Sequence, residues 1–203
     1  MKIKKFFKWL IILNLVMFVH YLTIKGIIDF SFSFERYLKI ENLIILILPP
    51  IIEEFIYRWG LVFSPKSFAF MIVSIPTTYL ISGIGLFLDS KNFLWVISIF
   101  CIMVISILFY FILMKRIKRN INSYAKFHEK NFKFILWISI ILFTISHYSN
   151  YEAYSFLMKI YFLAFIFFSG YVFSKVRISE GILFSILLHI ACLFSSGLYI
   201  NKI

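Results

Sequence analysis

The chain has 203 residues, of which 62% are hydrophobic, 21% are aromatic and only 15% are charged. A soluble domain is about half apolar and about a quarter charged, so this composition excludes an ordinary soluble protein and indicates one that lies in a lipid bilayer. The formal net charge of +12 does not indicate nucleic-acid binding, because no folded module with clustered basic residues accompanies it.

Seven apolar stretches are candidates for membrane-crossing helices, each of which needs about 20 residues. In chain order they cover residues 6–24, 43–63, 67–88, 93–114, 134–147, 154–173 and 181–200. The first follows a lysine-rich start but precedes no small-residue cleavage site, so we interpret it as a retained helix. The fold class expected is therefore all-α, a polytopic membrane bundle of about seven transmembrane helices. Residues 1–42 form an N-terminal helix with an outer loop, and residues 43–200 form the core.

Lysine and arginine lie mainly on one side of these stretches, before the first and between the fourth and fifth. The excess of basic residues on cytoplasmic loops places the N-terminus inside and the C-terminus outside. The basic stretch at residues 115–133 is also suited to a surface of anionic lipid.

Three ionisable residues occur together in the second stretch, where each costs about 2.5 to 3.5 kcal/mol on insertion scales. Glu54 and Arg58 are four residues apart, which places them on one helical face as a predicted structural ion pair. Glu53 is displaced by about 100° from Glu54, so we expect it to face a cavity. Pro49 and Pro50, one turn earlier, remove backbone donors and disturb the helix.

Two histidines lie deep in other stretches, His147 in the fifth and His189 in the seventh. A carboxylate in a low-dielectric pocket makes a useful general base, and an imidazole can orient water or bind developing negative charge. Together with Glu53 these residues predict a water-activating site for amide hydrolysis. The same atoms could hold zinc, because histidine and glutamate are ordinary zinc ligands.

The motifs at these positions resemble those of the CPBP family of intramembrane proteases, which includes the CAAX prenyl endopeptidases. Residues 53–58, EEFIYR, match the EExxxR motif, and residues 143–147, FTISH, match the FxxxH motif. The segment from Gly170 to His189 resembles the family's last two core helices. The resemblance covers residues 43–196, and it identifies residues 43–200 as a CPBP-like intramembrane protease core.

The resemblance implies a role for each site residue. Glu53 and His147 would activate the hydrolytic water, and His189 would help to bind the oxyanion. Glu54 and Arg58 would form a structural ion pair. The implied mechanism requires no cofactor, and zinc held by Glu53, His147 and His189 is the alternative that we do not favour.

The third motif of the family, HxxxN, is incomplete because Leu193 stands where asparagine is expected. An oxyanion site without this amide donor loses about 2.7 to 4 kcal/mol of transition-state stabilisation if nothing replaces it. Ser185 and Ser196 lie on the same helical face as His189 and could supply a donor.

Two functions from different classes follow from this resemblance. The first is an intramembrane endopeptidase that cleaves a membrane-embedded or membrane-delivered peptide, with no nucleic-acid partner. The second is a catalytically impaired protein on the same scaffold, acting in bacteriocin-type immunity or partner binding, which Leu193 favours. We expect an integral protein of a bacterial plasma membrane in either case.

The remaining polar residues are interpreted as structural. His128 lies in the basic stretch and is expected to be solvated, and His20 has only apolar neighbours and a lysine. Residues 179–181 are expected to cap the start of the last helix. Tyr148, Tyr151 and Tyr154 are typical of an interfacial aromatic belt. Cys101 and Cys192 lie in apolar runs, so we expect neither a disulfide framework nor a thiolate metal cluster.

Overall fold

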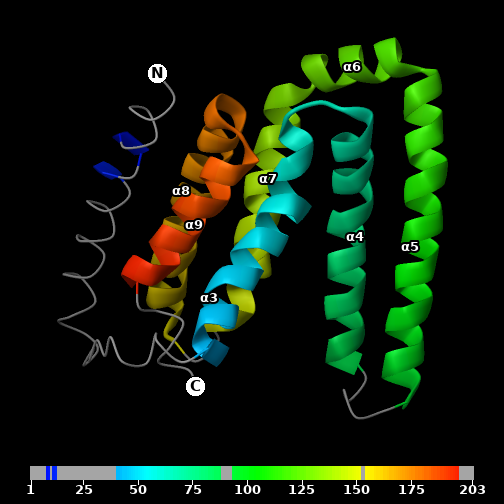
Figure 1. Cartoon of the computed structure of the whole chain (residues 1–203). Helices are drawn as coiled ribbons and strands as arrows, with labels where there is room; N and C mark the ends of the chain where they lie inside the picture. The colour runs from blue at the N-terminus through cyan, green and yellow to red at the C-terminus, as the bar shows by residue number, and fades with distance from the viewer. Residues whose placement is uncertain (1–7, 10, 13–39, 88–92, 152–153, 197–203) are drawn as a thin grey trace. The chain divides into compact units, whose positions relative to one another are not determined.

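The computed structural model describes residues 8–9, 11–12, 40–87, 93–151 and 154–196, and these residues are almost entirely helical, without a strand (Figure 1). The first predicted span, His20 and the chain termini fall largely or wholly outside this part. The helices run in the order α3 (Ile40–Glu53), α4 (Pro65–Phe87), α5 (Phe93–Arg119), α6 (Ile121–Lys130), α7 (Phe132–Ser146), α8 (Phe156–Glu180) and α9 (Ile182–Ser196). The all-α class is therefore confirmed for the described residues.

Three of these helices are long and apolar enough to cross a membrane, over Pro65–Ile84, Phe93–Arg119 and Phe156–Glu180. Two shorter apolar helices, Phe132–Ser146 and Ile182–Leu193, coincide with the fifth and seventh predicted spans. A membrane protein is compatible with these lengths, while the seven-span bundle and its orientation stay predictions.

The second predicted span is not one regular helix. Helix α3 contains Pro49 and Pro50 and ends at Glu53, where a single π turn over Glu54–Arg58 and a 3-10 turn over Trp59–Leu61 follow. Proline removes a backbone donor from the helical ladder, and π turns occur frequently at functional sites. The regular helix therefore ends at the residue that sequence motifs single out.

The chain divides into two compact units, which we describe separately. Unit 1 comprises residues 1–54 and 140–203, and unit 2 comprises residues 55–139, so that the division passes through α7.

In unit 2, α4 and α5 lie side by side and run antiparallel (Figure 1). Their contact buries Phe68, Ala69, Met71 and Ile117. The 3-10 turn that precedes α4 packs on it so closely that a Cβ built at Gly60 would lie 2.6 Å from the Cβ of Met71. Only glycine fits this approach.

The expectation that His128 is solvated is wrong. The basic stretch forms α6, and His128 within it is buried, with 6% of its surface exposed. Its Nε2–H donates to the Gly60 carbonyl at 3.1 Å, and its ring packs on Phe63, Phe68 and Phe132. Burial lowers the pKa of His128 below its ordinary value, against a smaller opposite effect of this hydrogen bond. Long-range aromatic packing, invisible in the local basic sequence, explains the difference.

In unit 1, α9 packs against both α3 and α8. Residues 179–181 do not cap the start of α9 as expected, because α8 continues through Glu180 and Gly181 is its C-cap. The φ angle of Gly181 is +108°, a conformation that favours glycine and lets α9 begin at the next residue. The two helices are thus joined by one residue.

Candidate active site

Three predicted catalytic residues of unit 1 lie together. Glu53 is the last residue of α3, His147 follows α7, and His189 lies within α9. The Nε2 atom of His147 is 3.7 Å from Glu53 Oε1, and the Nε2 atom of His189 is 3.6 Å from Glu53 Oε2. The Glu53 side chain keeps 21% of its surface exposed, against 9% for His147 and 4% for His189. The carboxylate is therefore the accessible member of a buried cluster.

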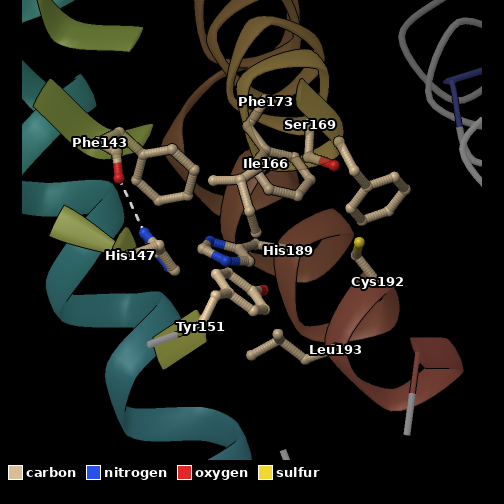
Figure 2. Close-up of a pocket in the computed structure, with 10 residues that line it drawn as sticks. Phe143, His147, Tyr151, Ile166, Ser169, Phe173, His189, Cys192 and Leu193 are labelled. Atoms are coloured by element: carbon tan, nitrogen blue, oxygen red, sulfur yellow. Dashed lines mark hydrogen bonds between the residues drawn. The ribbon is translucent and has the colours of Figure 1, made fainter. Parts of the chain in front are cut away.

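The His147 ring is oriented by its own helix. Its Nδ1 lies 2.8 Å from the carbonyl oxygen of Phe143, one turn earlier (Figure 2). Because a carbonyl only accepts, Nδ1 carries the hydrogen, and in the neutral ring the Nε2 lone pair faces Glu53. Phe143 also packs against this ring, with centroids 4.6 Å apart. The FxxxH spacing thus provides both a hydrogen-bond acceptor and a packing partner.

His189 is held between two carboxylates. Its Nδ1 is 3.1 Å from Glu54 Oε1, while its Nε2 faces Glu53. The ring stacks on Phe173, with centroids 4.4 Å apart and planes 24° from parallel. Glu54 is fully buried and also accepts a hydrogen bond from the Ser185 hydroxyl. Two adjacent glutamates therefore face opposite nitrogens of one imidazole.

The role of Glu54 at His189 is the feature that sequence reasoning missed. Helical spacing assigns Glu54 to Arg58 and sets Glu53 apart, whereas the chain enters a π turn at Glu54, next to Glu53. The ion pair itself stays a prediction, because Glu54 belongs to unit 1 and Arg58 to unit 2. Both side chains are fully buried. The sequence feature that could have indicated the contact between Glu54 and His189 is the pair of adjacent glutamates after two prolines.

Ser185 and Ser196 are the two serines expected to replace the missing amide donor, and the structure describes the side chain of only the first. Ser185 lies on the His189 face as predicted, but its hydroxyl contacts Glu54 and the carbonyl oxygen of Phe173. A hydroxyl has one hydrogen to donate, so Ser185 is a poor source of an oxyanion donor. The side chain of Ser196 lies outside the described residues.

A small pocket of about 40 Å³ adjoins His189 (Figure 2). Leu193, the residue in the asparagine position, lines it and packs against the buried Leu46 of α3. Tyr151, expected in an interfacial belt, also lines it, and its ring stacks on Phe162 with centroids 4.6 Å apart. A cavity of this volume has room for a few water molecules or a small side chain.

The arrangement of donors and acceptors suits a bound water. Separations of 3.6 and 3.7 Å are too long for direct hydrogen bonds, and catalytic contacts are often longer before substrate binds. A water beside Glu53 and His147 can donate one hydrogen to each, which leaves its oxygen lone pairs free to attack. The cluster can therefore orient a nucleophile and accept its proton.

The same donors resemble zinc ligands in one respect, because ligating histidines generally use their other nitrogen for a hydrogen bond. Nevertheless, no three His, Cys, Asp or Glu side chains among the described residues converge as a metal site. Cys101 is exposed and Cys192 is buried, and the two form no disulfide.

Comparisons of the chain with protein-family models, with curated proteins and with solved structures return no match.

Proposed function

We propose that the chain is an intramembrane endopeptidase of the CPBP type, which hydrolyses a peptide bond in a membrane-associated peptide by means of a glutamate-activated water. The observation that carries this proposal is the convergence of Glu53 with the Nε2 atoms of His147 and His189. An intramembrane carboxylate is expensive, and one that faces two oriented imidazoles indicates function more than packing.

In the proposed reaction, the water attacks the peptide carbonyl carbon and gives one proton to Glu53. His147 holds the water in line through its Nε2 lone pair. The carbonyl oxygen becomes an oxyanion, and the C–N bond then breaks while Glu53 returns the proton to the leaving amine. Atoms and charge balance without an additional reactant.

The proposed roles of His189 and Tyr151 concern the oxyanion. The Nε2 atom of His189 faces Glu53 and its Nδ1 faces Glu54, and donation from Nε2 to the oxyanion while Nδ1 donates to Glu54 requires a hydrogen on each ring nitrogen. Tyr151 lines the adjoining pocket and carries a hydroxyl, so we assign it the donor role that the family's asparagine has. Phenolic donors serve in oxyanion sites elsewhere.

The decisive experiment compares wild-type protein with Glu53→Gln. Both are reconstituted in bilayers and supplied with internally quenched peptides that carry an acyl chain as a membrane anchor. We expect the wild type to release fluorescence and the variant to lose at least about 100-fold in rate, because general-base catalysis typically contributes that much. Glutamine preserves the shape of the side chain, so circular dichroism should not change.

Three outcomes would redirect the proposal. Equal cleavage by Glu53→Gln would show that the base is misassigned, and loss of wild-type cleavage on adding a chelator would favour the zinc alternative. A wild type that binds peptides but cleaves none would favour the second candidate, an immunity or partner-binding protein. The specific observation behind that candidate is Leu193, which packs against Leu46 where an amide donor is expected.

A further inference from the structure

Unit 2 contains a second cavity, which is lined by none of the residues assigned to catalysis. It lies between α4 and α5, has a volume of about 410 Å³, and is lined by Phe70, Ser74 and Thr77 from α4 and by Met103, Ile107 and Phe111 from α5. A volume of this size falls within the range of sites for small organic ligands. Both walls are helices that are long and apolar enough to cross a membrane, which is compatible with a lipid surrounding.

The lining of this groove is apolar in effect. Thr77 Oγ1 lies 2.7 Å from the Val73 carbonyl and 2.7 Å from the hydroxyl of Ser106. The carbonyl can only accept, so Thr77 donates to it and accepts from Ser106, and both hydroxyl hydrogens are used within the protein. The groove therefore suits a hydrocarbon chain more than a polar molecule. Ile107 and Phe111 are 53% and 56% exposed, which leaves the groove open to the bilayer.

Two lysines, Lys66 and Lys118, lie beyond the groove residues at one end. Lys66 precedes Phe70 by four residues and Lys118 follows Phe111 by seven, spacings that keep each lysine on the face that lines the groove. Because α4 and α5 run antiparallel, the start of one helix meets the end of the other (Figure 1). Both lysines are exposed, and α4 and α5 contain no acidic residue.

We propose that this groove binds one anionic phospholipid, with an acyl chain between α4 and α5 and its phosphate against Lys66 and Lys118. Charge complementarity selects this occupant over a neutral lipid, because basic pockets between transmembrane helices bind anionic headgroups. The groove residues of α5 extend over about 12 Å, from Met103 to Phe111, which accommodates the upper part of an acyl chain.

The test is native mass spectrometry of the purified protein, incubated with an equal mixture of palmitoyl-oleoyl phosphatidylglycerol and phosphatidylcholine. The wild type should retain the anionic lipid preferentially. The double variant Lys66→Gln with Lys118→Gln should lose roughly 30-fold of that preference, since each basic side chain contributes ~1 kcal/mol near an anionic surface. The matched control is Arg116→Gln with Arg119→Gln, which removes the same charge from the opposite face of α5 and should keep the preference.

A second pair of variants tests the groove itself. Ile107→Trp fills the groove from a lipid-facing position and should reduce retention of both lipids. Ile105→Trp, at a residue that is 65% exposed and does not line the groove, should behave as the wild type. Equal retention of the two lipids by the wild type would overturn the proposal, as would loss of preference in the arginine control, unchanged retention by Ile107→Trp, or a groove occupied by a second copy of the chain.

Discussion

Two buried histidines, one in each unit, are held alike and yet face different chemistry. His147 donates from Nδ1 to the carbonyl of Phe143, and His128 donates from Nε2 to the carbonyl of Gly60. The remaining nitrogen of His147 faces the Glu53 carboxylate, whereas the His128 ring is packed against three phenylalanines. A carbonyl contact and burial are therefore common to both, and the partner of the second nitrogen distinguishes them.

The comparison teaches that burial of a histidine is weak evidence of function by itself. An imidazole with aromatic neighbours contributes packing and one hydrogen bond, and its neutral form suffices. An imidazole whose second nitrogen meets a carboxylate can hold a water between two acceptors or exchange a proton. We therefore expect substitution of His147 to lower activity and substitution of His128 to leave it unchanged.

The largest difference is expected when the two histidines are separately replaced by glutamine. His147→Gln should reduce kcat/KM for the anchored peptides by about 100-fold or more, because the oriented acceptor for the water is lost. His128→Gln keeps a donor for the Gly60 carbonyl and should leave activity per folded molecule unchanged. Similar losses of kcat/KM in both variants would contradict the distinction.

A smaller effect is expected at Glu54, which contacts His189 Nδ1 and, in the proposed reaction, does not contact the reacting atoms. Glu54→Gln should reduce turnover by about 10- to 100-fold, because hydrogen bonds to a charged group contribute about 1.5 to 3 kcal/mol. Ser185→Ala, which removes a donor to the same carboxylate, should have a weaker effect in the same direction.

The test at Glu54 separates positioning from folding. The yield of folded protein should fall as well. Total activity divided by the amount of folded protein distinguishes the two effects. If turnover per folded molecule stayed at the wild-type value in Glu54→Gln, the positioning role would be wrong. Arg58→Gln should lower the yield of folded protein, and normal expression would contradict the predicted ion pair.

A double-mutant cycle tests the proposed donor to the oxyanion. Tyr151→Phe should lower kcat by about 100-fold, the lower end of what loss of one oxyanion donor costs, with little change in KM. Leu193→Asn should leave activity equal or raise it, and in the Tyr151→Phe background it should restore part of the loss. A clear loss of activity in Leu193→Asn alone would show that packing against Leu46 dominates at this position.

The smallest effect concerns the pH dependence of stability in unit 2. Burial lowers the pKa of His128 in the folded chain, so below about pH 6.5 the unfolded chain binds the additional proton more readily. The contribution of His128 is therefore complete above pH 6.5 and is lost as the pH falls toward its folded pKa. The melting temperature of the wild type should fall more between pH 7.5 and pH 5.5 than that of His128→Asn. Parallel curves would refute a neutral, buried His128.

Much of the helical architecture could be predicted from the sequence, because long apolar runs bounded by charges leave few alternatives in a bilayer. The same holds for the grouping of Glu53, His147 and His189, which rests on motif spacing and agrees with their placement in unit 1. The contact between Glu54 and His189 could not be predicted, because a uniform helix of 3.6 residues per turn separates adjacent side chains by about 100°. The burial of His128 depends on rings far along the chain, such as Phe63 and Phe68, which local polarity conceals.

The joint at Gly181 gives α9 a fixed starting level. Only one residue connects α8 and α9, so the connection is too short to accommodate an insertion or a change in tilt without moving α9. His189 lies seven residues beyond the first residue of α9, or about 10 Å along the axis. The position of its imidazole along the axis is therefore set by the end of α8, so a longer linker at this corner would shift the ring relative to Glu53 even with no residue of the site replaced.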